Sequence, residues 1–383
     1  MLKVFKNGYV YNTDEKQFEK ADILVKDGVI EGVALGLSAD GAETVDCTGK
    51  YIIPGLVDVH THGRSGFDFN TATDENIRHM RKEYAKIGTT TIMATLASAT
   101  MDSLFESADA INENRKTEVG MANIAGIHLE GRYLNKIRRG AHNEGLLALP
   151  NVHELATLME RMSPLPIHIS AAYELEGGEM FLRVAKSLGA TCGLGHSDAT
   201  YDEAVKLVKS GVTSFTHTFN AMRPLHHREP GNASAALLCD GAYAEFICDG
   251  EHIHPAMIAL ASRAKPEDKL VLITDSMEAT GCPDGEYSIA GLPVFVKNGR
   301  AENSEGALAG STLDLFRGMC NYMKFTGKTL EEAIPCATSN PAAMVGIDNV
   351  CGSIKSGLRA DLIMINDKNT PVLDSVWVCG EKI

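Results

Sequence analysis

The two ends of the chain share a pattern of short, alternating apolar stretches broken by turn residues. Residues 2–10 alternate, and residues 23–30 form two apolar stretches joined by Asp27-Gly28. An Asp-Gly pair between alternating apolar positions is typical of a tight β-hairpin. Near the other end, candidate strands occur at Asp361–Ile365 and Val376–Glu381. The pattern therefore predicts β-structure at both ends.

Neither end has enough strands to form a stable sheet alone. We therefore expect residues 1–52 and 351–383 to pair into one small β-sandwich domain. Residues 53–350 are then inserted between them, and they have a different pattern.

This middle region contains eight short apolar runs, each followed by a helical stretch or by a loop that leads to one. The runs are Leu56–Val59, Thr89–Ala94, Ala125–Leu129, Pro166–Ser170, Thr191–Gly195, Ser214–Thr216, Ala244–Cys248 and Leu270–Thr274. Nearly continuous apolar strands that alternate with helices indicate a parallel sheet, and eight repeats predict a closed (β/α)8 barrel. The expected fold class is α/β: a TIM-like catalytic barrel inserted into a small β-sandwich.

Two of the intervening helices are clear from the sequence. Asp74–Lys86 carries its charges on one face, and Asp202–Lys209 follows Thr200, whose hydroxyl is a suitable N-terminal cap.

Composition narrows the class of partner. The 383 residues are 44% hydrophobic and 22% charged, which is an ordinary globular balance and excludes wholesale disorder. The net charge of -14 repels phosphate backbones and anionic lipid, and no cluster of Lys and Arg overrides it. No apolar run approaches the roughly 18 residues that span a bilayer. We therefore expect neither nucleic acid nor a membrane as a partner.

The 9 cysteines are scattered, form no CxxC pair and are odd in number. We interpret them as reduced, mostly buried residues of a cytoplasmic protein.

Polar residues with metal-binding chemistry follow several of the barrel strands, at the end of a barrel where active sites lie. His60 and His62 stand two residues apart on the first strand, so both point to the same face and can bind one metal ion. Single residues of the same kind follow later strands; they are His128 and Glu130, His196, His217 and Asp275. Each alone is compatible with a solvated or capping residue. Their recurrence at separate strand ends predicts a convergent metal site.

This constellation resembles the amidohydrolase superfamily, which has a barrel with an HxH motif on its first strand and an Asp on its last. Within it, the motifs resemble those of the N-acetylglucosamine-6-phosphate deacetylases, in order across nearly the whole chain. The matching segments are Gly126–Gly131, Gly195–Ala199, Thr216–Met222, His226–Gly231, Asp249–His252, Thr274–Ser276 and Leu308–Ser311.

The resemblance implies a ligand set. It makes Glu130, His196 and His217 the ligands of a principal metal, with His60 and His62 holding a second metal that Glu130 bridges. It thus implies one or two divalent metals in each subunit, and His and carboxylate ligands suit zinc or iron.

The same resemblance implies the chemistry of amide hydrolysis. A bound metal lowers the pKa of its water from about 16 to about 7. Asp275 is expected to take a proton from that water and deliver it to the departing amine, and His142 to polarise the acetyl carbonyl. The alternative for Asp275 is a ligand or a strand-end cap.

For the substrate, the resemblance implies a phosphorylated N-acetyl amino sugar. Asn220, Ala221, Arg228 and His252 are expected to meet its phosphate, and Arg suits this role because its planar group donates two hydrogen bonds. The sugar pocket is expected to include Ala141, Leu308, Ala309 and Gly310. In the family the Arg can come from a neighbouring subunit, which implies a homodimer. An ion pair between Arg228 and Glu229 is the alternative.

Two positions depart from the family pattern. Arg132 and Tyr173 each stand where the family usually has Pro, which frees loop backbone near the barrel mouth. Arg132 also brings a positive charge close in sequence to Glu130.

The leading hypothesis is a deacetylase that converts N-acetylglucosamine 6-phosphate to glucosamine 6-phosphate and acetate. One alternative applies the same chemistry to N-acetylgalactosamine 6-phosphate or another N-acyl amino sugar. The other is a non-catalytic barrel that senses or scaffolds.

Overall fold

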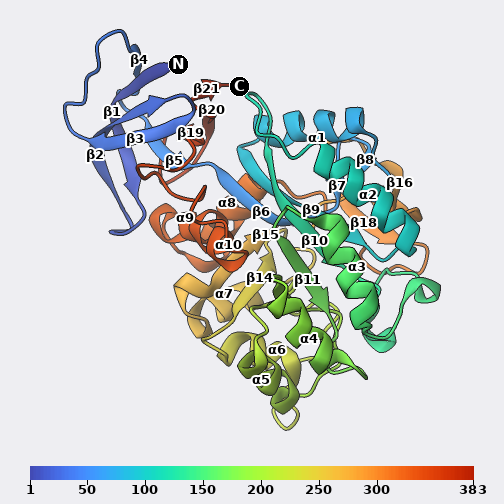
Figure 1. The fold of residues 1–383 in the computed structure, drawn as a ribbon. Helices are drawn as coiled ribbons and strands as arrows, with labels where there is room; N and C mark the ends of the chain where they lie inside the picture. The colour runs from blue at the N-terminus through green and yellow to red at the C-terminus, as the bar shows by residue number, and fades with distance from the viewer.

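Eight parallel strands form the predicted barrel at the centre of the molecule, in a computed structural model that describes all 383 residues (Figure 1). Neighbours in the barrel are also neighbours in the chain. The strands are β6 (Leu56–Thr61), β9 (Thr89–Ala97), β10 (Asn123–Glu130), β11 (Ile167–Ala171), β12 (Thr191–Leu194), β13 (Ser214–Phe215), β14 (Tyr243–Ile247) and β15 (Leu270–Ile273). Backbone bonds join the last strand to the first: Asp275 N–H donates to His60 O (2.9 Å) and His62 N–H to Ser276 O (2.8 Å).

Eight helices cover the outside of this barrel, one after each strand. They are α1 (Asp74–Lys86), α2 (Met101–Glu113), α3 (Val152–Met162), α4 (Gly178–Ser187), α5 (Tyr201–Ser210), α6 (Gly231–Leu238), α7 (Pro255–Ala264) and α8 (Leu315–Thr326). Both predicted helices are confirmed, and the Thr200 hydroxyl caps α5 by accepting the Glu203 N–H. Three short 3-10 helices also occur, at Lys136–Arg138, Glu144–Leu146 and Glu267–Lys269.

Two further helices, α9 (Leu330–Ala337) and α10 (Ser339–Met344), pack against the barrel near the start of its strands. The Asn340 side chain donates to the carbonyl of Leu270, the first residue of β15. This end of the barrel is therefore covered, and the other end holds the polar residues.

The two ends of the chain meet in one β-domain beside the barrel, where blue and red strands lie together in Figure 1. It is a single branched sheet in which β5 pairs with β19. Its strands are β1 (Leu2–Asn12), β2 (Gln17–Lys26), β3 (Val29–Ala34), β4 (Glu43–Asp46), β5 (Tyr51–Pro54), β19 (Leu362–Ile365), β20 (Leu373–Val378) and β21 (Glu381–Lys382). The predicted hairpin is present, with Asp27 and Gly28 both at positive φ. The shared core, in which the Phe5 and Trp377 rings lie 4.9 Å apart, confirms that both ends build this domain.

Five short strands that the sequence analysis did not predict lie between barrel elements. β7 (Gly63–Arg64) pairs with β8 (Phe67–Asp68) directly after the HxH motif. β16 (Gly285–Ile289), β17 (Leu292–Lys297) and β18 (Arg300–Asn303) form an antiparallel sheet between β15 and α8.

All nine cysteines are free, as expected. The longest apolar helices fall short of the length and hydropathy needed to cross a bilayer.

Candidate active site

The six side chains predicted to bind metal or move a proton meet at the carboxyl-terminal ends of the barrel strands. His60 lies on β6, His62 directly follows the last residue of that strand, and Glu130 ends β10. The other three each stand two positions after the end of a strand; they are His196, His217 and Asp275. All six are buried. The structure therefore brings together residues that are spread over more than half of the chain.

The carboxylate of Glu130 lies at the centre of this group. Its Oε1 lies 2.9 Å from Nε2 of His217 and 3.3 Å from Nε2 of His196. The same oxygen lies 3.4 Å from Nε2 of His60, and Oε2 lies 3.1 Å from Nε2 of His62. An acceptor-only group that faces four imidazoles from two oxygens is suited to bridge two metal positions.

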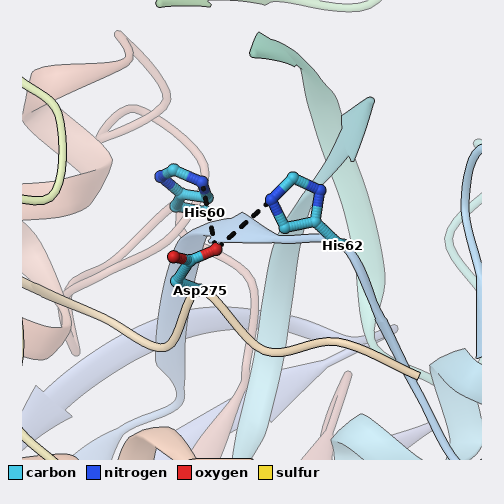
Figure 2. Close-up of side chains that lie close together, drawn as sticks. All are labelled: His60, His62 and Asp275. Atoms are coloured by element: carbon cyan, nitrogen blue, oxygen red, sulfur yellow. Dashed lines mark ion pairs between the residues drawn. The ribbon is translucent and has the colours of Figure 1, made fainter. Parts of the chain in front are cut away.

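Asp275 faces the two histidines of the HxH motif (Figure 2). Its Oδ1 lies 3.2 Å from Nε2 of His62 and 3.5 Å from Nε2 of His60. One carboxylate oxygen is thus directed at the candidate metal position, within reach of a water molecule held there.

The charges of this group reinforce each other. Burial disfavours the ionised form of Glu130, yet the imidazoles around it, His60 first, hold the pKa of its carboxyl well below its usual range. Burial also opposes protonation of His62, but hydrogen bonds to Asp275 and Glu130 raise the pKa of that imidazole to about 9. Against the same burial, His60 and His62 lower the pKa of Asp275 to about 2. Two ionised carboxylates in a buried group require positive charge nearby, which a divalent cation supplies when protons leave.

The imidazoles are oriented as metal ligands. Nδ1–H of His196 donates to the carbonyl of Arg138 at 2.8 Å, which leaves Nε2 with a free lone pair. Nδ1–H of His60 is directed at the buried carboxylate of Glu245 at 3.4 Å, and its buried Nε2 makes no hydrogen bond. Such outer partners fix the tautomer of metal-binding histidines. The donor atoms therefore fit a divalent metal, in two separate sets: His60, His62 and Asp275, and Glu130, His142 and His196.

Local backbone geometry turns three of these side chains toward the site. His196, His217 and Asp275 have φ values of 48°, 30° and 51°, in the left-handed region that residues with a side chain rarely adopt. Each stands two positions after the end of a short strand, so the left-handed turn redirects the chain where the strand ends. Backbone strain of this kind is found mainly at functional sites, where the surrounding structure maintains it.

His142, the predicted carbonyl-polarising residue, lies in the loop after β10. Its Nε2 is 3.7 Å from Oε2 of Glu130, and its ring stands edge-on to that of His196. On the opposite side, its Nδ1 is 3.0 Å from the Ser98 hydroxyl, which also accepts the backbone N–H of Arg132 at 3.0 Å. His142 is therefore held beside the metal-binding group.

One cavity of about 250 Å³ contains most of the predicted site. At one end lie His62, Glu130, His142 and Asp275. The rest of its lining includes the predicted substrate contacts Ala141, Asn220, Ala221, His252, Leu308, Ala309 and Gly310.

Asn220, Ala221 and His252 are half-buried, whereas the metal ligands that line the cavity are buried. Nδ1–H of His252 donates to Asp249 at 2.6 Å, which holds the imidazole in place. Arg228 is not part of the cavity lining: it is exposed, and its guanidinium lies 2.8 Å from Nε2 of His227. It makes no ion pair with Glu229.

Both departures from the family pattern are accommodated away from the reacting groups. Arg132 has a φ of 59° and a bonded N–H, neither of which Pro allows. Its side chain donates to Ala99 O (2.9 Å) and pairs with Glu154 (3.5 Å), so its charge is directed away from Glu130. The buried Tyr173 donates to the carbonyl of Ile169 at 2.8 Å.

Three residues that contact the site were missed by sequence reasoning. Glu245, in the middle of β14, and Ser98, just after β9, lie inside apolar runs that carry no motif. Ile289 lines the cavity from the end of β16. The alternation of buried Val294 and Val296 before Asn298-Gly299 was a hairpin signal that could have revealed this sheet.

The fold and the site together define a barrel hydrolase that holds a divalent metal. The sequence profile of the amidohydrolase family matches residues 51–383, and the chain belongs to this family. It is an enzyme of the class that hydrolyses amide bonds.

Two relatives and one solved structure show which members of this family the chain resembles. The chain is 32% identical to an N-acetylglucosamine-6-phosphate deacetylase of Lysinibacillus sphaericus, over 95% of this chain and 94% of the relative. It is 31% identical to an N-acetylgalactosamine-6-phosphate deacetylase of Escherichia coli O157:H7, over 96% of each chain. In structure it matches a variant of the N-acetyl-D-glucosamine-6-phosphate deacetylase of Mycobacterium smegmatis in complex with N-acetyl-D-glucosamine-6-phosphate. That match has a TM-score of 0.91 at 27% identity and covers 100% of this chain and 99% of the other.

Proposed function

We propose that this enzyme hydrolyses N-acetylglucosamine 6-phosphate to glucosamine 6-phosphate and acetate. The observation that carries the proposal is the single cavity with two chemically different ends. One end has buried histidines and carboxylates suited to metal-assisted hydrolysis. The other end has Asn220, Ala221 and His252, which suit a phosphate group. The relatives that share nearly the full length of the chain act on such sugars.

Hydrolysis needs a strong nucleophile and a proton carrier. A bound divalent metal lowers the pKa of water from about 16 to about 7 and polarises a carbonyl. Asp275, which is ionised and directed at the site, takes a proton from the attacking water. The water oxygen bonds to the acetyl carbon, the C–N bond breaks, and Asp275 passes the proton to the sugar nitrogen. Acetate and the free amine leave.

His142 is placed to donate a hydrogen bond to the carbonyl oxygen. Ser98 accepts the N–H of Arg132, so its own hydroxyl proton is available to Nδ1 of His142. With Nδ1 as the acceptor, the proton of the neutral imidazole lies on Nε2, on the side of Glu130. A donor in this position stabilises negative charge that develops on the oxygen.

Phosphate binding involves a second copy of the chain in this proposal. Asn220, Ala221 and His252 provide contacts from one subunit. The exposed position of Arg228, outside the cavity of its own chain, supports its acting on the phosphate of a neighbouring subunit in a homodimer. The free cysteines support a cytoplasmic location.

The E. coli relative supports N-acetylgalactosamine 6-phosphate as a second candidate substrate. The mixed imidazole and carboxylate donors support zinc or iron as the metal, with one or two ions in each subunit.

The test is acetate release by protein of known metal content, before and after chelation. We expect release from N-acetylglucosamine 6-phosphate, loss of activity on chelation, and recovery when zinc or ferrous iron is returned. Unphosphorylated N-acetylglucosamine is the control for the phosphate contacts. Comparison of kcat/KM between the two sugar epimers decides between the candidates. Absence of acetate from both substrates with metal-loaded protein would contradict the proposal.

A further inference from the structure

A small apolar recess opens from the reactive end of the active-site cavity. Its volume is about 30 Å³, against about 250 Å³ for the cavity itself. The two spaces share His62, Glu130, Ala141, His142 and Ile289 as lining residues. The recess does not touch any residue of the phosphate end. It therefore borders the reacting groups but none of the residues proposed to contact the phosphate.

The remaining wall of the recess suits a small hydrocarbon group. Ala97, Ala290 and Leu292 contribute apolar surface beside Ile289 and Ala141. A water-sized group needs roughly 10–15 Å³ of cavity, and a methyl group is of similar size. The recess has room for one such group and little more, and its apolar wall favours a methyl over water.

We propose that this recess holds the methyl group of the acetyl substituent and thereby sets the length of the acyl chain that the enzyme accepts; the inference rests on the proposed function. The carbonyl carbon carries three substituents. Its nitrogen leads to the sugar and the phosphate end, and its oxygen faces His142 and the metal-binding group. The recess, beside His62 and Glu130, is where the third substituent fits.

The wall is bonded to the small hairpin that follows the HxH motif. Ile289 and Leu292 are paired across the two-residue turn that joins β16 to β17. The N–H of Ala290, in that turn, donates to the buried carboxylate of Asp68 at 2.9 Å. Asp68 belongs to β8, which pairs with β7 directly after His62. A wall held in this way cannot easily retreat from a longer acyl chain.

Leu292 separates the recess from a larger space. A neighbouring cavity of about 340 Å³ is lined by the same Ala141, Asn143, Ile289 and Leu292. Shortening Leu292 removes part of this shared wall, so the recess gains volume in the direction in which a longer chain would extend.

The experiment compares glucosamine 6-phosphate carrying N-acetyl, N-propionyl or N-butyryl groups as substrates of the metal-loaded enzyme. For the wild type we expect kcat/KM to fall at least about tenfold from acetyl to propionyl, because one methylene too many must be forced into a filled pocket. In Leu292→Ala we expect the propionyl-to-acetyl ratio to rise at least about tenfold, and butyryl to become a substrate. Leu292→Val is a milder variant, for which a smaller change in the same direction is expected.

The matched control is Phe295→Ala on the same strand, because Phe295 is 45% exposed and borders neither space. It should keep the wild-type ratio. If the wild type releases acetate but accepts propionyl and butyryl equally well, or if neither Leu292 variant changes the ratio, the recess proposal alone is wrong. If metal-loaded wild type releases no carboxylate from any of these substrates, the proposed function is wrong and the recess proposal with it.

Discussion

At the metal end of the active-site cavity the side chains, apart from His142, are buried and belong to the barrel strands or to the first residues after them. At the phosphate end, Asn220, Ala221 and His252 are half-buried and belong to loops. Glu130 ends a strand and His62 directly follows one, and each contacts several charged neighbours. Asn220 and Ala221 lie in the loop after β13, and Arg228 is exposed and outside the lining of its own cavity.

The difference follows from what each end must do. Bond cleavage needs groups held within fractions of an ångström, which strand ends with buried partners provide. Recognition of a phosphate needs donors that gather as the substrate arrives, and those can come from loops and from a second subunit. The metal end should therefore be intolerant of single changes, and the phosphate end should lose affinity before it loses chemistry.

The largest expected effect is that of Asp275→Asn at the metal end. The amide keeps the shape of the carboxylate but cannot take up a proton, so we expect kcat to fall about 10²- to 10⁴-fold. The measurement is acetate release, with metal content and thermal unfolding as controls for an intact site. Full activity in this variant would remove Asp275 from its role as proton carrier.

The second prediction concerns Glu245, whose carboxylate contacts two histidines of the metal end. Its carboxylate faces Nδ1 of His60 and accepts the N–H of His217 at 3.2 Å. Glu245→Gln removes the charge that orients His60, and we expect the metal dissociation constant to rise about 10- to 100-fold. Competition with a coloured chelator measures this directly, with the exposed Glu286→Gln as the matched control. Unchanged metal affinity would show that the contact is not needed for binding.

The third prediction probes the phosphate end. Arg228→Ala should raise KM about tenfold or more with little change in kcat, since a charge-assisted hydrogen bond to phosphate is lost. A large fall in kcat with unchanged KM would show that Arg228 takes part in bond cleavage. The phosphate end would then not be limited to binding.

Mixing variants tells whether Arg228 acts across subunits. Refolded mixtures of Arg228→Ala and Asp275→Asn chains contain hybrid dimers. If the Arg comes from the neighbour, one site in each hybrid has both groups, and part of the activity returns. If it acts within its own chain, no hybrid site is complete, and at substrate concentrations well below KM the mixture is no more active than the average of its two parents.

The smallest expected effect is that of Arg132→Gln. Arg132 is close in sequence to Glu130, but its charge is paired with Glu154. We expect kcat to stay within about twofold of wild type and the free energy of unfolding to fall by about 1 kcal/mol. Chemical denaturation and steady-state kinetics measure the two quantities. A tenfold change in kcat would mean that catalysis at the metal end depends on charges that do not contact its residues.

Much of the fold could be predicted because the barrel strands are nearly continuous apolar runs. All eight predicted runs coincide with barrel strands, since burial on both faces leaves a strong signal. The sheet of β16, β17 and β18 gives a weaker signal because one of its faces is exposed, and only the short alternation before Asn298-Gly299 marks it.

The residues of the site also divide into those that the sequence pattern predicts and those that it does not. His60 and His62 could be predicted from their spacing on one strand, since the period of a strand is local. The left-handed turns at His196, His217 and Asp275 could not, because a positive φ at a residue with a side chain is imposed by tertiary contacts. Glu245 was missed for another reason: an acidic residue within a strand has no sequence signal, and only its approach to His60 reveals its role.

The pairing of β5 with β19 has a consequence for the order of events during synthesis. β5 leaves the ribosome before any barrel strand, and its partner β19 follows only after the last barrel helix. Until then β5 presents an unpaired edge, which is open to pairing with other chains. The pairing of β5 with β19 also forms late, since segments that are distant in the chain meet more slowly than neighbouring ones. We therefore expect the nascent barrel to form first and to bring the two halves of the β-domain together, so that mutations weakening the barrel should also promote aggregation through β5.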